Sequence, residues 1–366
     1  MIDVLVAGGG PVGLATAICC ARAGLSVTVA EPRNPPIDKA CGEGVMPAAL
    51  RRLAALGVDP DGHPLRGIRY LDASHRADAL FRHGAGRGVR RTALHAALAD
   101  RAAALGIPVL PVRVTSFTQH PGHVSAADVE ARYLVAADGL HSAIRRSVEE
   151  SRSGSGAGSG SASRAGTGRG GHVARRTAQP RYGLRRHFRI APWTDLVEVY
   201  WTPHAEAYVT PVASDLVGVG LLFARATEQS GEFDGLLAGF PALRDRLRGA
   251  AAASDVRGAG PMRQDVRRRV YDRVLLVGDA SGYLDALTGE GIGVGLAQAE
   301  VLAACLAAGR PGGYERAWRR VSSPAWRFTA GLLWSRNQPL LAERIVAAAQ
   351  HLPWVFTALV NHAAEA

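Results

Sequence analysis

Two mainly apolar runs near the N-terminus are separated by a glycine-rich stretch and a segment with helical character. Ile2–Ala7 has the composition of a buried strand, and Ser26–Ala30 is a second run of this kind. Between them lies Gly8-Gly9-Gly10-Pro11-Val12-Gly13, which leads into the helical segment. The pattern predicts a strand–turn–helix–strand unit that ends at Glu31.

Two later apolar strands are each followed closely by an aspartate. Tyr133–Ala137 precedes Asp138-Gly139, and Val274–Val277 precedes Gly278-Asp279. Strands of a parallel sheet bind ligands beyond their carboxyl ends, so both aspartates are expected at one binding edge. The later stretch Thr288–Gly295 leads into an alanine- and leucine-rich helix, whose first N–H groups are free to face a ligand.

The middle of the chain has the pattern of an antiparallel sheet. Its short β-branched and aromatic segments are Tyr182–Ile190, Leu196–Trp201, Ala207–Val212 and Leu216–Phe223, and Gly67–Asp72 is expected to join them. The last part of the chain is predicted to be helical and apolar, with breaks at Pro339 and Pro353. These helices are expected to pack on the rest of the chain, with closure of an apolar pocket or contact with a membrane surface as alternatives.

These patterns divide the chain into segments. The predicted fold is α/β: a Rossmann-like nucleotide-binding domain, an inserted antiparallel β-sheet substrate domain and a C-terminal helical segment. The first domain comprises residues 1–66, 86–150 and 255–312, the second comprises 67–85 and 180–254, and the helices comprise 313–366. Residues 151–171 are rich in Ser, Gly, Ala and Arg, which is typical of a flexible linker or surface insertion.

Composition removes several classes of function. The 366 residues carry a net charge of +11, but the basic residues are scattered arginines, Lys39 is the only lysine, and no nucleic-acid-binding motif appears. The four cysteines show no paired spacing, and no histidine cluster has metal-ligand spacing. No apolar run is long enough to span a membrane, and the first strand begins at the N-terminus without a leader. We therefore expect a cytoplasmic protein without a metal site.

The glycine-rich turn indicates the ligand. Gly8 permits the tight turn, Gly10 lets backbone N–H groups approach a pyrophosphate, and Gly13 lets the helix pack closely on the strand. The following helix begins with unpaired N–H groups, and Glu31 is placed to accept hydrogen bonds from a ribose. Strand, turn, helix and acid together predict a bound dinucleotide.

The motifs GGGPVG, Glu31, ADGLHSAIR and LLVGDASGYLDALTGEGIG occur here in the order typical of one superfamily. The chain resembles the FAD-dependent monooxygenase and geranylgeranyl-reductase superfamily, whose fold is similar to that of p-hydroxybenzoate hydroxylase. The resemblance implies FAD as the cofactor and NADPH or NADH as the electron donor. It assigns cofactor contacts to Gly8, Gly10, Pro11, Val12, Gly13, Glu31, Arg33, Arg91, Asp138, Gly139, Gly278, Asp279, Gly289, Gly291 and Ile292.

The same resemblance suggests where a substrate binds. The middle sheet covers the flavin in that superfamily, which makes Trp201, Tyr208, Thr210 and Tyr70 candidate pocket residues, although aromatic residues in a sheet are often simple core. The loop containing Cys41 resembles one that approaches the flavin from the substrate side. Tyr208, Glu290 and Cys41 are candidate catalytic residues without an assigned role.

Three functions remain open at this stage. The main hypothesis is an NAD(P)H-dependent monooxygenase that hydroxylates an aromatic, polyketide or lipid-like small molecule through a flavin hydroperoxide. The second is a geranylgeranyl-reductase-like enzyme that saturates prenyl double bonds, which the Cys41 loop and the apolar C-terminal helices favour. The third is a non-redox flavoprotein that acts as a scaffold or cyclase. The expected partner is an apolar or aromatic small molecule, and the sequence leaves the oligomeric state open.

Overall fold

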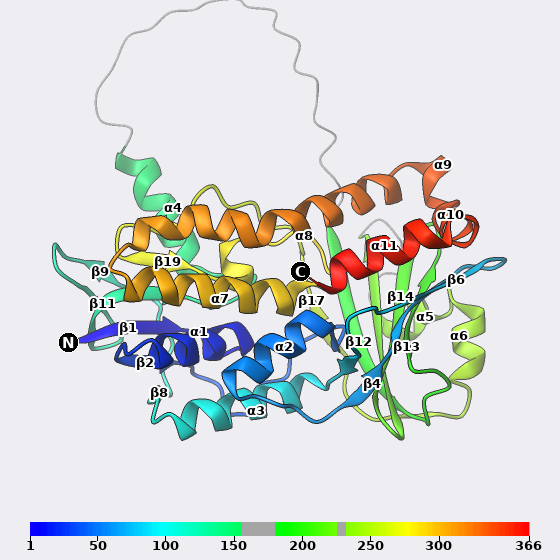
Figure 1. Cartoon of the computed structure of the whole chain (residues 1–366), viewed down its shortest axis with the longest axis horizontal. Helices are drawn as coiled ribbons and strands as arrows, with labels where there is room; N and C mark the ends of the chain where they lie inside the picture. The colour runs from blue at the N-terminus through cyan, green and yellow to red at the C-terminus, as the bar shows by residue number, and fades with distance from the viewer. Residues whose placement is uncertain (156–179, 225–231, 366) are drawn as a thin grey trace, which may run out of the picture.

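The computed structural model describes residues 1–155, 180–224 and 232–365. Two large sheets lie at opposite ends of the molecule, and the long helices α7 (Gly291–Ala307) and α8 (Tyr314–Arg336) lie alongside them (Figure 1). The mixed α/β architecture with C-terminal helices confirms the predicted fold class.

The first sheet is built around β1, which pairs in parallel with a strand on each side. Its strands in spatial order are β18 (Val270–Tyr271), β19 (Val274–Leu276), β11 (Val129–Ala136), β1 (Ile2–Ala7), β2 (Val27–Ala30) and β8 (Val109–Leu110), with β10 (Val124–Ala126) and β9 (Thr118–Gln119) extending from β11. The central strands are apolar because both faces of the sheet are covered.

Helices cover one face of this sheet and a smaller layer covers the other. The first layer consists of α1 (Pro11–Arg22), α2 (Pro47–Leu56), α3 (Arg91–Ala104) and α7, against which α8 packs. The opposite face is covered by α4 (Ala143–Ser155) together with β10. Pro11 opens α1 at its first position, where a missing N–H costs nothing.

The second sheet carries the inserted segment of the chain. Its strands in spatial order are β16 (Ala251–Ala252), β12 (Arg181–Arg189), β15 (Leu216–Ala224), β14 (Ala205–Ala213), β13 (Leu196–Trp201), β5 (Gly67–Leu71) and β6 (Arg76–Leu80), and β17 (Arg257–Ala259) also pairs with β12. The expected strand at Gly67–Asp72 is present. It pairs with β13 in parallel, so the sheet is mixed and the expectation of an antiparallel sheet was wrong at this edge.

Two helical layers cover the second sheet. The short helices α5 (Phe233–Leu237) and α6 (Pro241–Arg246) pack on one face. The other face meets α8, α10 (Ile345–His351) and α11 (Pro353–Ala364), with α9 (Pro339–Ala342) between α8 and α10. The breaks at Pro339 and Pro353 are where the sequence placed them, whereas Pro324 lies within α8 without ending it.

The remaining elements are small. A three-stranded sheet consists of β3 (Gly44–Val45), β7 (Gly86–Gly88) and β4 (His63–Leu65), and the 3-10 helices are η1 (Gly278–Ser281) and η2 (Pro311–Gly313). β17 lies beyond residue 254, where the second domain was expected to end. The predicted linker 151–171 lies outside the described residues, except for residues 151–155 at the end of α4.

Candidate functional site

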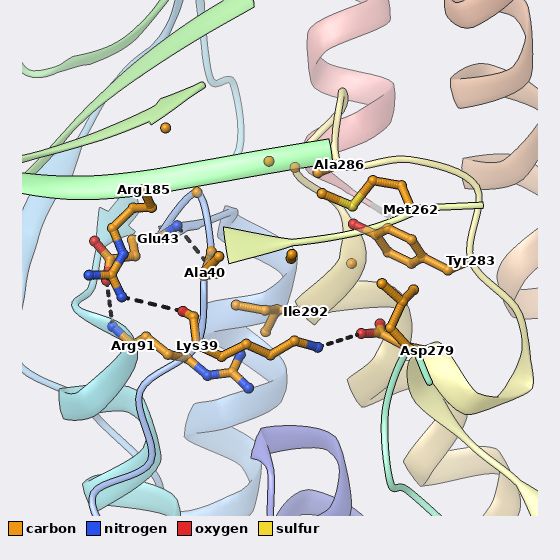
Figure 2. A pocket seen from close by; sticks show the side chains of 18 of the residues that line it. Lys39, Ala40, Glu43, Arg91, Arg185, Met262, Asp279, Tyr283, Ala286 and Ile292 are labelled. Atoms are coloured by element: carbon orange, nitrogen blue, oxygen red, sulfur yellow. Dashed lines mark hydrogen bonds and ion pairs between the residues drawn. The ribbon is translucent and has the colours of Figure 1, made fainter. Parts of the chain in front are cut away.

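A cavity of about 850 Å³ is lined by segments that are far apart in the sequence. The turn after β1, the loops after β11 and β19, and the start of α7 form one part of its wall. The loop 37–46 and strands of the second sheet form the other part (Figure 2). This volume lies in the upper range for small-molecule and cofactor sites.

The glycine-rich turn forms one end of the cavity and requires its glycines. Gly8 has φ +110°, and a Cβ on Gly13 would lie 1.9 Å from the carbonyl oxygen of Gly8. Gly10 and Gly13 line the cavity, and Gly10 offers no side chain to cap the first N–H groups of α1. These N–H groups are therefore available to an anion.

Two arginines add positive charge beside this turn. Arg91 is the first residue of α3, and its Nη2 lies 3.8 Å from the position of a Cβ on Gly10. The Nε of Arg91 is buried and has no hydrogen-bond partner among the described residues. Arg33 also lines the cavity. The turn, α1 and the two arginines together form a cradle for an anionic group.

Glu31 holds this turn in place. Its Oε2 accepts a hydrogen bond from the Gly9 N–H at 2.8 Å, and both carboxylate oxygens bind the Arg33 guanidinium. Burial raises the pKa of Glu31, but the hydrogen bonds from Arg33 and Gly9 outweigh it and keep the pKa below its ordinary value. Arg33 lines the cavity and Glu31 does not, so the ribose contact of Glu31 stays a prediction.

Lys39 and Asp279 form an ion pair at the cavity (Figure 2). The Nζ of Lys39 lies 3.1 Å from Oδ2 of Asp279, and about a third of each side chain is exposed. Gly278 places the aspartate with φ +62°, and its N–H donates to the Gln298 side chain. The pair connects residues 240 positions apart and lies at the carboxyl end of β19, as predicted for Asp279.

Asp138 and Gly139 lie at the carboxyl end of β11 and also line the cavity. Gly139 has φ +85°, which favours glycine. The Oδ2 of Asp138 accepts a hydrogen bond from the N–H of Ala143 at 2.9 Å. Asp138 therefore caps the start of α4 while its backbone shapes the cavity.

The start of α7 faces the cavity from another side. Gly289, Gly291 and Ile292 line it, and the helix begins without a side-chain cap. Glu290 behaves differently: it is 6% exposed, is absent from the lining of the large cavity and receives a hydrogen bond from Thr288. Burial raises the pKa of Glu290 to about 7. Glu290 therefore does not line the large cavity, and its catalytic role stays a prediction.

The loop 38–44 is fixed by a buried polar network beneath the cavity. Glu43 has φ +61° and accepts hydrogen bonds from His187 Nε2 at 2.6 Å and from the Arg91 N–H at 2.9 Å. Arg185 donates to Nδ1 of His187 at 3.0 Å, so the proton of His187 lies on Nε2. Arg185 also binds Asp38. It donates to the carbonyl oxygen of Lys39 as well (Figure 2). The network joins β12, this loop and the start of α3.

Cys41 lies on the same loop and lines the cavity. The backbone N–H of Glu43 donates to its Sγ at 3.4 Å. The carbonyl oxygen of the next residue, Gly42, accepts a hydrogen bond from the Thr210 hydroxyl at 2.8 Å. The second sheet therefore holds the Cys41 loop against the cavity.

The second sheet supplies an apolar wall that includes three of the four predicted pocket residues. Tyr70, Tyr208 and Thr210 line the cavity. Burial raises the pKa of Tyr208 well above its ordinary value, and its hydroxyl donates to the carbonyl oxygen of Leu287 at 2.8 Å. Trp201 does not line the cavity, because it packs behind Tyr70 with ring centroids 5.2 Å apart. A pocket role for Trp201 stays a prediction.

Several lining residues were not assigned from the sequence. Lys39 and Glu43 lie on the Cys41 loop and received no role of their own, although a single lysine in an arginine-rich chain is itself a signal. Tyr182, Met262 and Tyr283 line the cavity, as do Phe328 from α8 and Val360 and Ala363 from α11. No local pattern distinguishes them from core residues, since tertiary packing alone brings them to the cavity.

The residues present fit FAD. The glycine-rich turn leaves space that a Cβ would fill, and the adjoining buried Arg91 Nε has no partner in the described structure. An anionic pyrophosphate would satisfy both the N–H groups of α1 and this guanidinium. Among residues 1–155, 180–224 and 232–365, no three His, Cys, Asp or Glu side chains gather to hold a metal ion.

Comparison with known proteins supports FAD as the cofactor. Residues 1–166 match the family described as FAD binding domain. A flavoprotein/dehydrogenase from Cytophaga hutchinsonii has a similar structure, with a TM-score of 0.76 at 18% identity over 100% of this chain and 93% of that one. At this identity the likeness establishes the fold.

Two curated relatives have different activities and cover different shares of the chain. Menaquinone reductase of Mycolicibacterium smegmatis is 26% identical over 344 residues, which is 86% of this chain and 79% of that protein. Phenazine 1,6-dicarboxylic acid hydroxylase of Lysobacter antibioticus is 32% identical over 179 residues, which is 41% of this chain and 43% of that protein.

Proposed function

We propose that this chain, an FAD-dependent oxidoreductase, is an NAD(P)H-dependent monooxygenase that hydroxylates an apolar, ring-containing small molecule. The observation that carries the proposal is the continuity of the cavity. It passes from the anion cradle at α1, past the start of α7, to an apolar wall on the second sheet. One cavity thus has a polar end suited to a dinucleotide and an apolar end suited to a substrate.

Different residues would bind different parts of FAD. The N–H groups of α1 and Arg91 would hold the pyrophosphate. Arg33 would lie at the adenosine end of FAD, and Asp279 would bind its ribityl chain. The free N–H groups at Gly291 and Ile292 would stabilise negative charge on the ring. When bound, FAD supplies hydride transfer from NAD(P)H and the activation of oxygen.

At the substrate end of the cavity, the side chains of the protein would orient the substrate and exclude water. Ile68, Val197 and Val199 line the wall beside Tyr70 and Tyr208. The hydroxyl of Tyr208 is occupied by the Leu287 carbonyl oxygen and its pKa is raised, so Tyr208 would position the loop before α7 and would not act as a base. These side chains would exclude water and orient an apolar ring.

A second candidate function is favoured by a specific observation. The relative aligned over 86% of this chain is a menaquinone reductase, whereas the hydroxylase aligns over 41%. We therefore keep as an alternative the saturation of a prenyl double bond. In that reaction two electrons and two protons add to the carbon–carbon bond and no oxygen is consumed.

Oxygen stoichiometry tests the two candidates. In hydroxylation, NAD(P)H gives two electrons, one oxygen atom enters the product and the other leaves as water. We expect the purified flavoprotein, given NAD(P)H and an apolar phenol, to consume oxygen in equal amount to the hydroxylated product. Label from ¹⁸O₂ should appear in that product.

The opposite result is equally clear. Product that forms anaerobically, with a prenylated substrate gaining two hydrogens, would replace hydroxylation by the reductase alternative. Bound flavin that NAD(P)H does not reduce with either class of substrate would favour the non-redox hypothesis.

A further inference from the structure

Large apolar side chains are exposed at one end of the chain. Between Trp334 and Leu359 the exposed fractions are 61% for Trp334, 79% for Leu340, 41% for Leu341, 48% for Leu352, 71% for Trp354 and 43% for Leu359. Only four other large apolar residues in the described parts of the chain are exposed: Met1, Leu80, Val109 and Val112. Such concentration marks an interaction surface, because exposed apolar residues normally occur singly.

These six residues, which we call the C-terminal apolar surface, belong to neighbouring helices. They lie at the end of α8, on α9, at the junction of α10 and α11, and on α11. Figure 1 shows these helix ends together at one end of the molecule, and α8 contacts α9 as α10 contacts α11. The helices stay folded through their inner faces, where Val346, Phe356 and Val360 are buried.

The inner faces of the same helices line the cavity. Phe328 on α8 and Val360 and Ala363 on α11 are part of its wall. The C-terminal apolar surface and this part of the cavity wall therefore belong to the same two helices, α8 and α11.

Charge distinguishes the possible occupants of this surface. Arg327 and Arg344 are exposed on α8 and before α10, with Glu343 as the adjoining acid. The whole chain carries +11. This charge opposes the pairing of two copies and favours an anionic surface. Tryptophan beside leucine and arginine is also the composition that suits the boundary between lipid headgroups and acyl chains.

We propose that the C-terminal apolar surface docks this protein on a lipid bilayer that contains anionic headgroups. The expectation of peripheral membrane contact from the sequence thereby gains a defined location. Within the described residues, no helix combines the length and the hydropathy that a transmembrane span needs. The purpose of docking, delivery of an apolar substrate to the cavity, rests on the proposed function, whereas the docking itself does not.

Vesicle flotation of the full chain tests the proposal. The lipids are phosphatidylcholine with or without roughly a third phosphatidylglycerol. We expect binding to the mixed vesicles and a reduction on the order of tenfold in the double variant Trp334→Ser/Trp354→Ser. Both indoles are mostly exposed, so the variant should retain the unfolding temperature of the parent protein.

The matched control makes the same kind of change elsewhere. Val109→Ser/Val112→Ser alters two exposed apolar residues, 50% and 38% exposed, at and just after β8. This variant should bind vesicles as the parent protein does. Brominated acyl chains should also quench tryptophan emission in the parent protein and much less in the Trp334/Trp354 variant.

Three outcomes would overturn the proposal. The parent protein could fail to bind mixed vesicles, or the tryptophan variant could bind them as well as the parent. The variant could also abolish a concentration-dependent dimer in sedimentation velocity without vesicle binding, which would assign the surface to a second copy. Binding is measured without substrate, so oxygen uptake with a short, water-soluble phenol separately decides whether the proposed function fails.

Discussion

Glu290 is a single residue whose burial makes the stability of the protein depend on pH. Burial raises its pKa to about 7 from an ordinary value of 4.5, and its Oε1 has no hydrogen-bond partner among the described residues. The native state therefore keeps a proton that the unfolded state loses. The stability that this group contributes is complete below pH 4.5 and is lost as the pH rises through about 7.

The variant Glu290→Gln should remove this dependence, because its side chain is neutral at every pH. In the parent protein, the titration of Glu290 should lower the free energy of unfolding by roughly 3 kcal/mol between about pH 5 and 8. The variant should lack this decrease. Denaturant unfolding at both pH values measures the difference. Glu343→Gln, a change at an exposed acid, should leave the pH profile unaltered. Parallel profiles for parent and Glu290→Gln would contradict the assignment.

Asp279 is expected to decide whether the protein retains flavin. Its carboxylate pairs with Lys39 beside the α1 cradle. Asp279→Ala should remove a hydrogen-bond acceptor for the polar chain of FAD and leave Lys39 without its partner. We expect the variant to be purified with on the order of a tenth or less of the parent flavin content, measured by absorbance after denaturation.

The control for this variant removes a solvent-exposed carboxylate. Asp245 pairs with Arg248 on the surface, with 57% of its side chain exposed. Asp245→Ala should retain full flavin content. A full flavin content in Asp279→Ala would mean that Asp279 does not contribute to FAD binding.

At the scale of elements, the contact between α1 and β1 depends on Gly13. A Cβ at this position would lie 1.9 Å from the Gly8 carbonyl oxygen, which is backbone and cannot move away cheaply. Gly13→Ala should therefore shift α1 away from the sheet, lower the free energy of unfolding by about 3 kcal/mol or more, and abolish flavin retention.

Gly331→Ala is the matched control for this substitution. Gly331 lies within α8, and a Cβ on it would have no neighbouring atom of the described chain within 4 Å. Alanine there should stabilise the protein by about 0.5–1 kcal/mol, because glycine weakens a helix interior. Thermal unfolding with flavin quantification separates the two effects. Equal behaviour of the two variants would mean that α1 packs differently from the described structure.

Local patterns predicted the elements better than they predicted the side chains of the site. The turn at Gly8–Gly13 and the strand before Asp279 involve neighbours in sequence, so their roles in the fold were visible. The Lys39–Asp279 pair and the Glu43–His187 contact join residues 240 and 144 positions apart. Such contacts form only when distant segments of the chain fold against one another.

The positions of individual side chains in the site depend on the same packing. Trp201 points to the same sheet face as Val197 and Val199, but Tyr70 on the neighbouring strand lies between it and the cavity. Alternation along a strand gives the face and not the depth of burial. Glu290 directly precedes the first residue of α7, and its side chain turns towards Thr288 and Thr329. The direction of a side chain at a helix start is set by packing, which the sequence does not display.

At the scale of the whole molecule, Glu206 connects the C-terminal helices to the second sheet. It is fully buried on β14, accepts a hydrogen bond from Arg181 Nη2 at 2.6 Å, and binds Arg336 near the end of α8. Arg181 has a second partner in Asp285, at 2.9 Å. Arg336 also donates to the Pro203 carbonyl oxygen, but Glu206 is the carboxylate that neutralises it. This link holds α8 over the apolar end of the cavity.

Removing Glu206 should therefore loosen the C-terminal layer more than the FAD-binding layer. Glu206→Ala leaves the buried Arg336 charge without a carboxylate, which should lower the free energy of unfolding by about 3–5 kcal/mol. Amide hydrogen exchange should become faster from the end of α8 through α11. In β1 and α1, the exchange rates should rise only by the amount that the loss of global stability explains. Asp215→Ala, in an exposed pair with Arg189, should alter neither quantity. Uniform acceleration across both sheets would instead mean that the two layers unfold as one cooperative unit, and that the cavity could not open at its C-terminal side without global unfolding.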